Sequence, residues 1–220
     1  MNLKTLTTLA LVSAALSCGP KRVATPVPPD EPALRVMTFN VNYGLAGDEA
    51  TLEAIGAADV DVVFLQETTP AWEAVIRKRF SGDFAQIGFV HCCGAGGLGV
   101  LSKLPLESRG ILEPPEKGWF PAWHFVLDSP LGPVQALNVH LHPPVSDSGS
   151  FVSGYFSTKS VREAEIESYW SELDDALPTI VAGDFNEGKG GKAISFLRAK
   201  GLESALPEFA PSADTWRWQT

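Results

Sequence analysis

The sequence has little cysteine and few basic residues, and it contains no long apolar run outside its N-terminus. Cysteine occurs 3 times in 220 residues, which excludes a small scaffold held together by many disulfides. Lysine and arginine number 17 against 26 aspartate and glutamate residues, so the formal net charge is −9. This acidic balance argues against non-specific binding to a nucleic-acid backbone, which requires clustered basic residues. The fractions of hydrophobic (45%) and charged (20%) residues are those of a globular protein.

The N-terminus has the features of an export signal. Lys4 precedes an uncharged stretch, Leu6 to Leu16, which is shorter than the roughly 20 apolar residues of a membrane span and matches a signal-peptide core. The following Ser17-Cys18 completes a sequence that resembles the lipobox of bacterial lipoproteins. We therefore predict a signal peptide over residues 1–17, lipidation of Cys18, and an exported lipoprotein of the cell envelope, tethered to the membrane. The alternative is a plain secretory signal with an incidental cysteine, and hence a secreted protein.

The residues after the signal predict a tether and then one folded domain. Residues 18–32 contain five prolines, and such a segment stays extended and builds no core. The folded domain is expected over residues 33–220. It contains two adjacent cysteines, Cys92 and Cys93, which we expect as two thiols because a disulfide between neighbouring residues closes a strained ring. A vicinal disulfide is the alternative.

Short β-rich runs alternate with amphipathic segments along the domain, which predicts a mixed α/β sandwich rather than a purely parallel sheet. Antiparallel pairs are indicated by hairpin signals such as the turn sequence from Asp128 to Gly132. Strands are expected at Leu34–Asn42, Val60–Gln66, Phe84–Val90, Leu98–Ser102, Trp123–Leu127, Val134–Leu141 and Thr179–Ala182. Helices are expected at Thr51–Ala58, Pro70–Phe80 and Val161–Leu177.

Polar residues that core packing does not need follow several of these strands. They are Asn40, Glu67, His140, Asp184 and Asn186. Loops at strand ends are where α/β folds assemble their sites. A buried carboxylate without a partner costs several kcal/mol, so Glu67 and Asp184 are each expected to have a cation or a donor group beside them. Taken singly, the asparagines and aspartate could form turns, and His140 could be a core histidine.

Five sequence blocks carry these residues in order: TFNVNYG, DVVFLQET, GGLGVLSKLPL, NVHLHP and IVAGDFN. Together they resemble the endonuclease/exonuclease/phosphatase superfamily, which includes deoxyribonuclease I and neutral sphingomyelinases. The resemblance extends from Leu34 to about Trp218. It implies an α+β fold of four layers, in which two mixed β-sheets pack face to face between outer helices.

The resemblance also implies a metal site. Glu67 matches the glutamate that binds the divalent metal, usually Mg²⁺, and Asn40 matches the asparagine beside that metal. Mg²⁺ suits so few protein ligands, because it keeps waters and substrate phosphate oxygens in its coordination shell. Mn²⁺ or Ca²⁺ could replace it.

Further residues take catalytic and binding roles from the resemblance. His140 matches the histidine that hydrogen-bonds a phosphate oxygen and helps to protonate the leaving group. Asp184 matches the aspartate that positions or activates the attacking water, and Asn186 matches the amide that holds the site and the phosphate in place. Asn42 and His142 are additional candidates for substrate binding. A zinc site at His140 and His142 would need at least one more ligand, and the sequence offers none.

Two departures from the family pattern affect this interpretation. Members of the family continue past the position of Trp216-Arg217-Trp218 with an aspartate-bearing strand and a final Ser-Asp-His, whereas this chain ends at Thr220. We therefore expect an incomplete domain with its last strands missing. Nucleases of the deoxyribonuclease I type orient the motif histidine with a glutamate, but Gly96-Gly97-Leu98-Gly99 occupies that region here. A backbone carbonyl or His142 is expected to hold His140 instead.

These features predict a Mg²⁺-dependent hydrolase of phosphoester bonds, exported and membrane-tethered. Its substrate would be a phosphoester of a lipid, a small molecule or a nucleic acid, and no protein partner is inferred. A secreted nuclease is disfavoured by the acidic charge and by the glycine-rich strand. The alternative from another class is a truncated or degenerate relative that binds a partner at the cell surface without catalysis.

Overall fold

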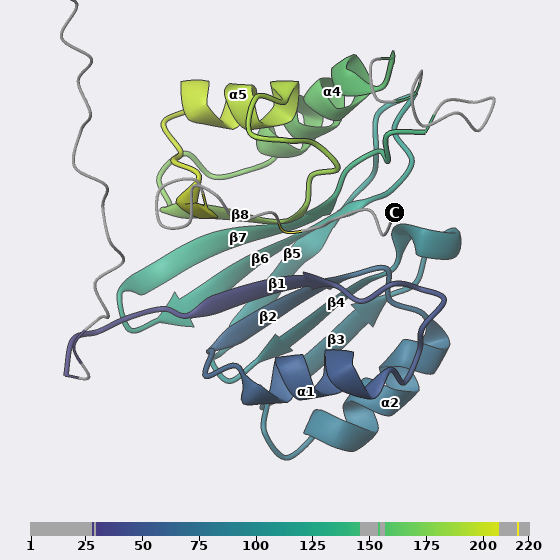
Figure 1. Cartoon of the computed structure of the whole chain (residues 1–220). Coiled ribbons are helices and arrows are strands. Elements are labelled where there is room, and N and C mark those ends of the chain that lie inside the picture. Colours follow the sequence, from purple (N-terminus) through teal and green to yellow (C-terminus); the bar gives the residue numbers. More distant parts are fainter. Residues whose placement is uncertain (1–27, 29, 146–153, 155–156, 207–214, 216–220) are drawn as a thin grey trace, which may run out of the picture. The chain divides into compact units, whose positions relative to one another are not determined.

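Two four-stranded β-sheets pack face to face, with helices on the outer side of each (Figure 1). The computed structural model describes residues 28, 30–145, 154, 157–206 and 215. Val27–Ser204 form one unit, and this unit contains both sheets. The predicted signal peptide, Cys18 and most of the predicted tether lie outside the described residues, so export and lipidation stay predictions. None of the helices in the described ranges has the length and apolar character to cross a membrane.

The first sheet has the strand order β1-β2-β4-β3. β1 and β2 are parallel, whereas β4 is antiparallel to both β2 and β3. Its strands are β1 Val36–Asn40, β2 Val62–Gln66, β3 Gln86–Val90 and β4 Leu98–Ser102. Its outer face is covered by α1 Glu49–Ala57 and α2 Pro70–Phe80, and a short 3₁₀ turn, η1 Gly94–Gly96, precedes β4.

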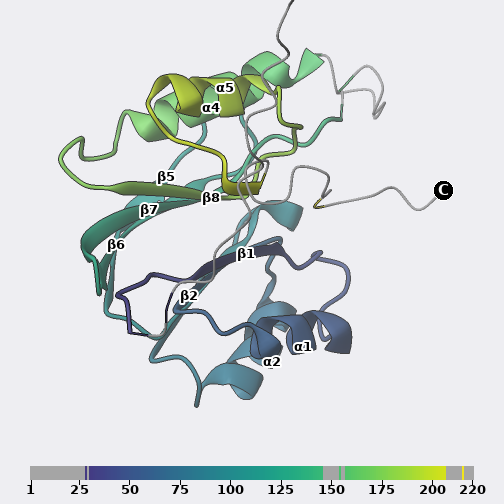
Figure 2. The same ribbon diagram turned by 60° about the vertical axis from the view of Figure 1, so that its left-hand side comes forward.

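The second sheet has the order β5-β6-β7-β8. β5, β6 and β7 are antiparallel neighbours, and β8 is parallel to β7. Its strands are β5 Leu106–Leu112, β6 Ala122–Ser129, β7 Gly132–His140 and β8 Thr179–Asp184. The helices α4 Lys159–Trp170 and α5 Lys192–Ala199 lie over its outer face, as the turned view in Figure 2 also shows. The predicted four-layer sandwich is confirmed.

Strand β2 shows how the sequence produces the layers. Successive side chains of a strand point to opposite faces, so a strand buried on both sides reads as a continuous apolar run. Val63 and Leu65 pack outward against the helices, in a core with Ile55 of α1 and Trp72 of α2. The side chain of Phe64 points inward instead and packs against Phe125 of the second sheet. A third core joins β7 to the helices α4 and α5.

A buried polar bridge joins the two sheets beside the ends of β2 and β7. The Asn138 side chain is fully buried, and its Oδ1 accepts a hydrogen bond from Gln66 Nε2 at 2.8 Å. Its Nδ2 donates to the carbonyl oxygens of Leu65 (3.2 Å) and Gly99 (3.1 Å). These bonds satisfy the buried amide and fix the register of one sheet on the other. Glu67 and His140 follow one and two residues after the bridging side chains.

Most predicted elements are confirmed with shifted ends, two expectations are wrong, and two elements were not predicted. The predicted helix Val161–Leu177 ends at Trp170, because Gln135 of β7 donates to the carbonyls of Asp174 and Leu177 and so binds this segment to the sheet. Strand β5 and helix α5 were not predicted at all. The expected two thiols are replaced by a disulfide between Cys92 and Cys93.

Candidate active site

Four strand ends, two from each sheet, bring the predicted residues together. Asn40 ends β1, and its Nδ2 donates to Glu67 Oε1 at 2.8 Å and to Asp184 Oδ2 at 2.9 Å. Glu67 follows β2, the parallel neighbour of β1, and Asp184 ends β8, where it pairs in register with His140 of β7. One amide group therefore joins two carboxylates that come from different sheets and lie 117 residues apart in the chain. The convergence expected from the sequence is present.

The backbone of the site is unusual. Among the described residues, the non-glycine positions with φ in the left-handed region are Asn42 (60°), Glu67 (60°) and Asn186 (50°), all of which are predicted site residues. Residues other than glycine rarely adopt this backbone conformation, and such strain clusters at functional sites. Beside Glu67, the backbone of Gly97 approaches Thr68 so closely that an added Cβ would lie 1.9 Å from the Thr68 carbonyl oxygen. Glycine is therefore required there.

Both carboxylates are held by backbone donors while remaining partly accessible. Glu67 Oε2 accepts from the Tyr43 amide at 3.1 Å, and its side chain is 18% exposed. Asp184 Oδ1 accepts from the Asn186 amide at 2.9 Å, and its side chain is 31% exposed. Asn186 Nδ2 donates to the Leu141 carbonyl at 2.8 Å, which fixes the loop after β8 to the end of β7. The two carboxylates are thus preorganised, and each side chain keeps part of its surface accessible.

The two asparagines after β1 form a turn. Asn40 Oδ1 accepts from the Asn42 amide at 3.0 Å, so the amide nitrogen of Asn40, and not its oxygen, faces the carboxylates. Asn42 Oδ1 accepts from the Gly44 amide, and its carbonyl accepts from Trp72 Nε1. The structure therefore uses both side chains to hold backbone and carboxylates in place.

His140 lies beneath the carboxylates. Its side chain is 2% exposed, and Nε2 lies 3.9 Å from Glu67 Oε1 and 4.0 Å from Asp184 Oδ2. Nδ1 lies 3.1 Å from the Ala95 carbonyl oxygen, which can only accept, so Nδ1 carries the proton. Of the two holders expected from the sequence, the backbone carbonyl is confirmed. Burial lowers the pKa of His140, and the charges of Asp184 and Glu67 oppose that shift.

His142 lies beyond the end of β7 and has other neighbours. Its ring packs on Trp119 with centroids 4.2 Å apart, and its Nδ1 donates to the Pro143 carbonyl at 2.7 Å. Trp119 is 42% exposed, whereas His142 is buried. The adjacent Phe120 stacks on His140 at 4.6 Å. The segment before β6 thus contacts both histidines.

Two buried charged residues of α4, which the sequence analysis missed, hold the backbone around His142. Arg162 Nη1 donates to the His142 carbonyl at 3.1 Å, and Glu165 accepts from the amides of His142 (2.8 Å) and Trp119 (3.1 Å). Arg162 Nε also lies 3.4 Å from Glu187 Oε2, in the loop after Asn186. Both side chains of α4 are fully buried. The sequence does contain a signal for them, because both charged residues lie on the apolar stripe of the helix, three residues apart.

Glu165 makes stability depend on pH. Burial raises its pKa from the ordinary value of 4.5 to about 7, against the opposing effect of the two amides and Arg162. Because the folded state then binds the proton more tightly than the unfolded state, we expect the free energy of unfolding to fall as pH rises from about 4.5 to about 7. The shift corresponds to about 3 kcal/mol, at about 1.4 kcal/mol per pH unit. When the free energy of unfolding measured with urea is plotted against pH over this range, it should fall less steeply in Glu165→Gln than in the parent. In Glu163→Gln, which removes a partly exposed partner of Lys192, it should fall as steeply as in the parent.

The donor set suits a hard divalent cation. Among the described residues, no group of three or more His, Cys, Asp and Glu side chains is arranged to hold a metal ion. What the site offers is two accessible carboxylates fixed on one amide. Mg²⁺ binds through one or two carboxylates with waters and phosphate oxygens completing its shell, whereas structural zinc requires four nitrogen or sulfur ligands. Glu67 and Asp184 therefore fit Mg²⁺.

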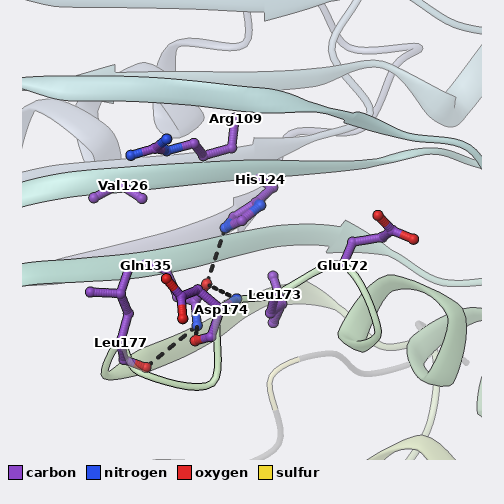
Figure 3. Close-up of a pocket in the computed structure, with 8 residues that line it drawn as sticks. All are labelled: Arg109, His124, Val126, Gln135, Glu172, Leu173, Asp174 and Leu177. Atoms are coloured by element: carbon purple, nitrogen blue, oxygen red, sulfur yellow. Dashed lines mark hydrogen bonds between the residues drawn. The ribbon is translucent and has the colours of Figure 1, made fainter.

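A pocket on the second sheet lies apart from this cluster (Figure 3). It lies between β5, β6, β7 and the segment that follows α4, and none of the predicted site residues lines it. Its polar groups bond to one another: His124 Nε2 donates to Gln135 Oε1 at 3.2 Å, and Gln135 Nε2 donates to the Asp174 carbonyl at 2.7 Å. These contacts hold the segment after α4 on the sheet, which is a structural task.

Comparisons with known proteins agree with this architecture. The sequence model of the "Endonuclease/Exonuclease/phosphatase family" matches residues 37–220. None of the curated protein sequences compared with the chain matches it. Three solved structures with the same fold are sphingomyelinase C from Streptomyces griseocarneus, the human Nocturnin catalytic domain with bound sulfate, and a functionally unknown conserved protein from Enterococcus faecalis V583.

Each of the three covers most of the chain at low identity. The sphingomyelinase is 20% identical, with a TM-score of 0.56, and the match covers 78% of this chain and 70% of that one. Nocturnin is 17% identical, with a TM-score of 0.57 and coverage of 80% and 73%. The Enterococcus protein is 19% identical, with a TM-score of 0.56 and coverage of 76% and 72%. At these identities the likeness establishes the fold.

Proposed function

The chain belongs to the endonuclease/exonuclease/phosphatase family, and from this premise we propose that it is a Mg²⁺-dependent hydrolase of phosphoester bonds. Hydrolysis of phosphoesters is the activity of the family, whose members typically depend on a divalent metal. The observation that carries the proposal is the convergence of Glu67, Asp184, Asn40 and His140 from four strand ends. The packing of the hydrophobic core gives no reason for these four polar groups to lie together.

We assign the metal to Glu67. Its carboxylate is fixed by Asn40 and the Tyr43 amide and is still 18% exposed. A bound Mg²⁺ supplies positive charge that neutralises the charge developing on the phosphoryl oxygens. Asn40 orients this carboxylate and that of Asp184 through its amide nitrogen. Mn²⁺ and Ca²⁺ share the preference for oxygen ligands and are expected to compete for the site.

The remaining groups act on water and phosphate. Asp184, the more accessible carboxylate, positions the attacking water and accepts its proton. Asn186 holds that carboxylate through its backbone amide. His140 presents Nε2 toward the same space as the carboxylates, and in its doubly protonated form, with Nδ1–H donating to Ala95, its Nε2–H donates to a phosphate oxygen and supplies a proton to the leaving group. The net charge of −9 favours a small-molecule or lipid phosphoester over a long nucleic acid.

Metal titration tests the proposal. We expect the full-length chain to hydrolyse bis(p-nitrophenyl) phosphate or p-nitrophenyl phosphate, to lose this activity with a chelator, and to regain it with Mg²⁺. In Glu67→Gln, the Mg²⁺ concentration for half-maximal rate should rise at least about tenfold. Glu53→Gln, at an exposed glutamate of α1, serves as the matched control.

Two results would count against this function. Hydrolysis that persists after chelation, or an unchanged Mg²⁺ midpoint in Glu67→Gln, would remove the assigned metal role. A folded chain that neither binds Mg²⁺ by calorimetry nor hydrolyses either probe would favour a non-catalytic protein that binds a partner at the cell surface.

A further inference from the structure

The segment between β3 and β4 contains the Cys92–Cys93 disulfide and also supplies the partner of His140. Ala95, two residues after the disulfide, accepts from His140 Nδ1 through its carbonyl at 3.1 Å. The segment is fixed at its other end, where the Thr68 amide donates to the Gly97 carbonyl at 3.0 Å. The position of the Ala95 carbonyl therefore depends on the three residues, Gly94 to Gly96, between the disulfide and this anchor.

The two sulfur atoms lie beside Gly96 and close to the Phe120 ring that stacks on His140. A Cβ added to Gly96 would lie 3.1 Å from Cys93 Sγ and 3.3 Å from Cys92 Sγ, and 2.6 Å from Cδ1 of Phe120. Both sulfurs and the Phe120 ring thus enclose the same glycine, and Phe120 stacks on His140. Cys93 Sγ also lies 3.7 Å from the Trp119 carbonyl oxygen. The disulfide contacts both structures that hold His140: the loop and the aromatic segment.

We propose that the Cys92–Cys93 disulfide is a positioning element for His140, acting through the Ala95 carbonyl. The bond closes a small ring around one peptide group and so restricts the backbone immediately before η1. With the bond intact, Ala95 fixes the imidazole with its proton on Nδ1. A backbone carbonyl takes here the orienting role that a carboxylate often has beside a functional histidine.

Opening the disulfide releases this restraint. A dithiol reductant transfers two electrons and two protons, so the Cys92–Cys93 bond breaks, two thiols form, and the reductant becomes a disulfide. The loop then reaches conformations in which Ala95 no longer meets Nδ1. The predicted export supports the oxidised form as the working state, because disulfides persist in oxidising compartments.

The kinetic arm of the test rests on the proposed function. It uses the full chain carrying Cys18→Ser, so that Cys92 and Cys93 are the remaining cysteines. Reduction with dithiothreitol should lower kcat for the phosphoester probe by about 10–100-fold, the usual effect of losing an orienting partner, with KM changed less than about twofold. Reoxidation should restore kcat. The variant that also carries Cys92→Ser and Cys93→Ser should match the reduced form and ignore the reductant.

The second arm does not require catalysis. In ¹⁵N NMR spectra above neutral pH, neutral His140 should carry its proton on Nδ1 in the oxidised chain. In the reduced chain and the triple variant, the Nε2–H tautomer should increase, because Nε2 faces the carboxylates of Glu67 and Asp184. An unchanged tautomer, or equal kcat in oxidised and reduced enzyme, would overturn the proposal. A tautomer shift in a chain without hydrolysis would uphold it while counting against the proposed function.

Discussion

Asp184→Asn is expected to lower kcat for phosphoester hydrolysis by about 10²–10⁴-fold, the range typical for loss of a general base. Asparagine cannot accept a proton from water. In the parent, Asn40 Nδ2 donates to Asp184 Oδ2 at 2.9 Å and the Asn186 amide donates to Asp184 Oδ1. The NH₂ group of the new asparagine would face one of these two donors, so one of the two hydrogen bonds is lost. Since water activation belongs to the transition state, KM should change far less than kcat. Steady-state kinetics at saturating Mg²⁺ measures both.

A matched substitution separates this role from general damage. Asp83→Asn replaces an exposed aspartate beyond the end of α2 and should leave kcat unchanged. Thermal unfolding of both variants shows whether the sandwich is intact. A folded Asp184→Asn enzyme that keeps more than about a tenth of the parent kcat would remove Asp184 from the chemical step.

His140 allows its two nitrogens to be tested separately. Asparagine places a donor near the position of Nδ1, so His140→Asn can keep the bond to Ala95 but loses Nε2. We expect kcat to fall by about 10²–10⁴-fold. Glutamine reaches further and can place a donor near Nε2, between Glu67 and Asp184, so His140→Gln should recover part of that loss. It cannot transfer a proton, and full recovery is not expected.

The informative result is which of the two variants, His140→Asn or His140→Gln, has the higher kcat. If His140→Asn is as active as the parent, Nε2 has no role in the reaction. If glutamine is no better than asparagine, proton transfer rather than hydrogen bonding is the main contribution of His140. His91→Asn, at a partly exposed histidine that pairs with Glu73 on α2, controls for the loss of an imidazole.

Patterns within single segments of the sequence were sufficient to predict most of the helices and strands. Helix α2 begins and ends where Pro70 and Phe80 predicted, and strand β4 covers the predicted Leu98–Ser102. Strand β5 was missed because it is an edge strand with Glu107, Ser108 and Arg109 exposed and a bulge between Ser108 and Gly110. Its pairing with β6 makes it a strand, and the residues of the segment alone do not reveal that pairing.

The convergence of the candidate site residues was predictable for a different reason. Glu67, Asp184 and His140 each interrupt an apolar context at a strand end, and the five motifs in order indicated that they meet. The contacts that orient them were not predictable, because they come from the tertiary structure. The Ala95 carbonyl has no side-chain signature, and Arg162 and Glu165 acquire a role only when α4 lies over the end of β7.

The division of the cluster between the sheets has a further consequence. The first sheet contributes Asn40 and Glu67, and the second contributes His140 and Asp184, while the connection from β4 to β5 passes between them as one short loop. Neither half of the chain holds together the residues to which we assign metal binding, water activation and phosphate binding. Under the proposed function, catalytic turnover therefore requires the two sheets to dock on each other, and a chain split after Ser102 should regain activity only when both fragments reassociate.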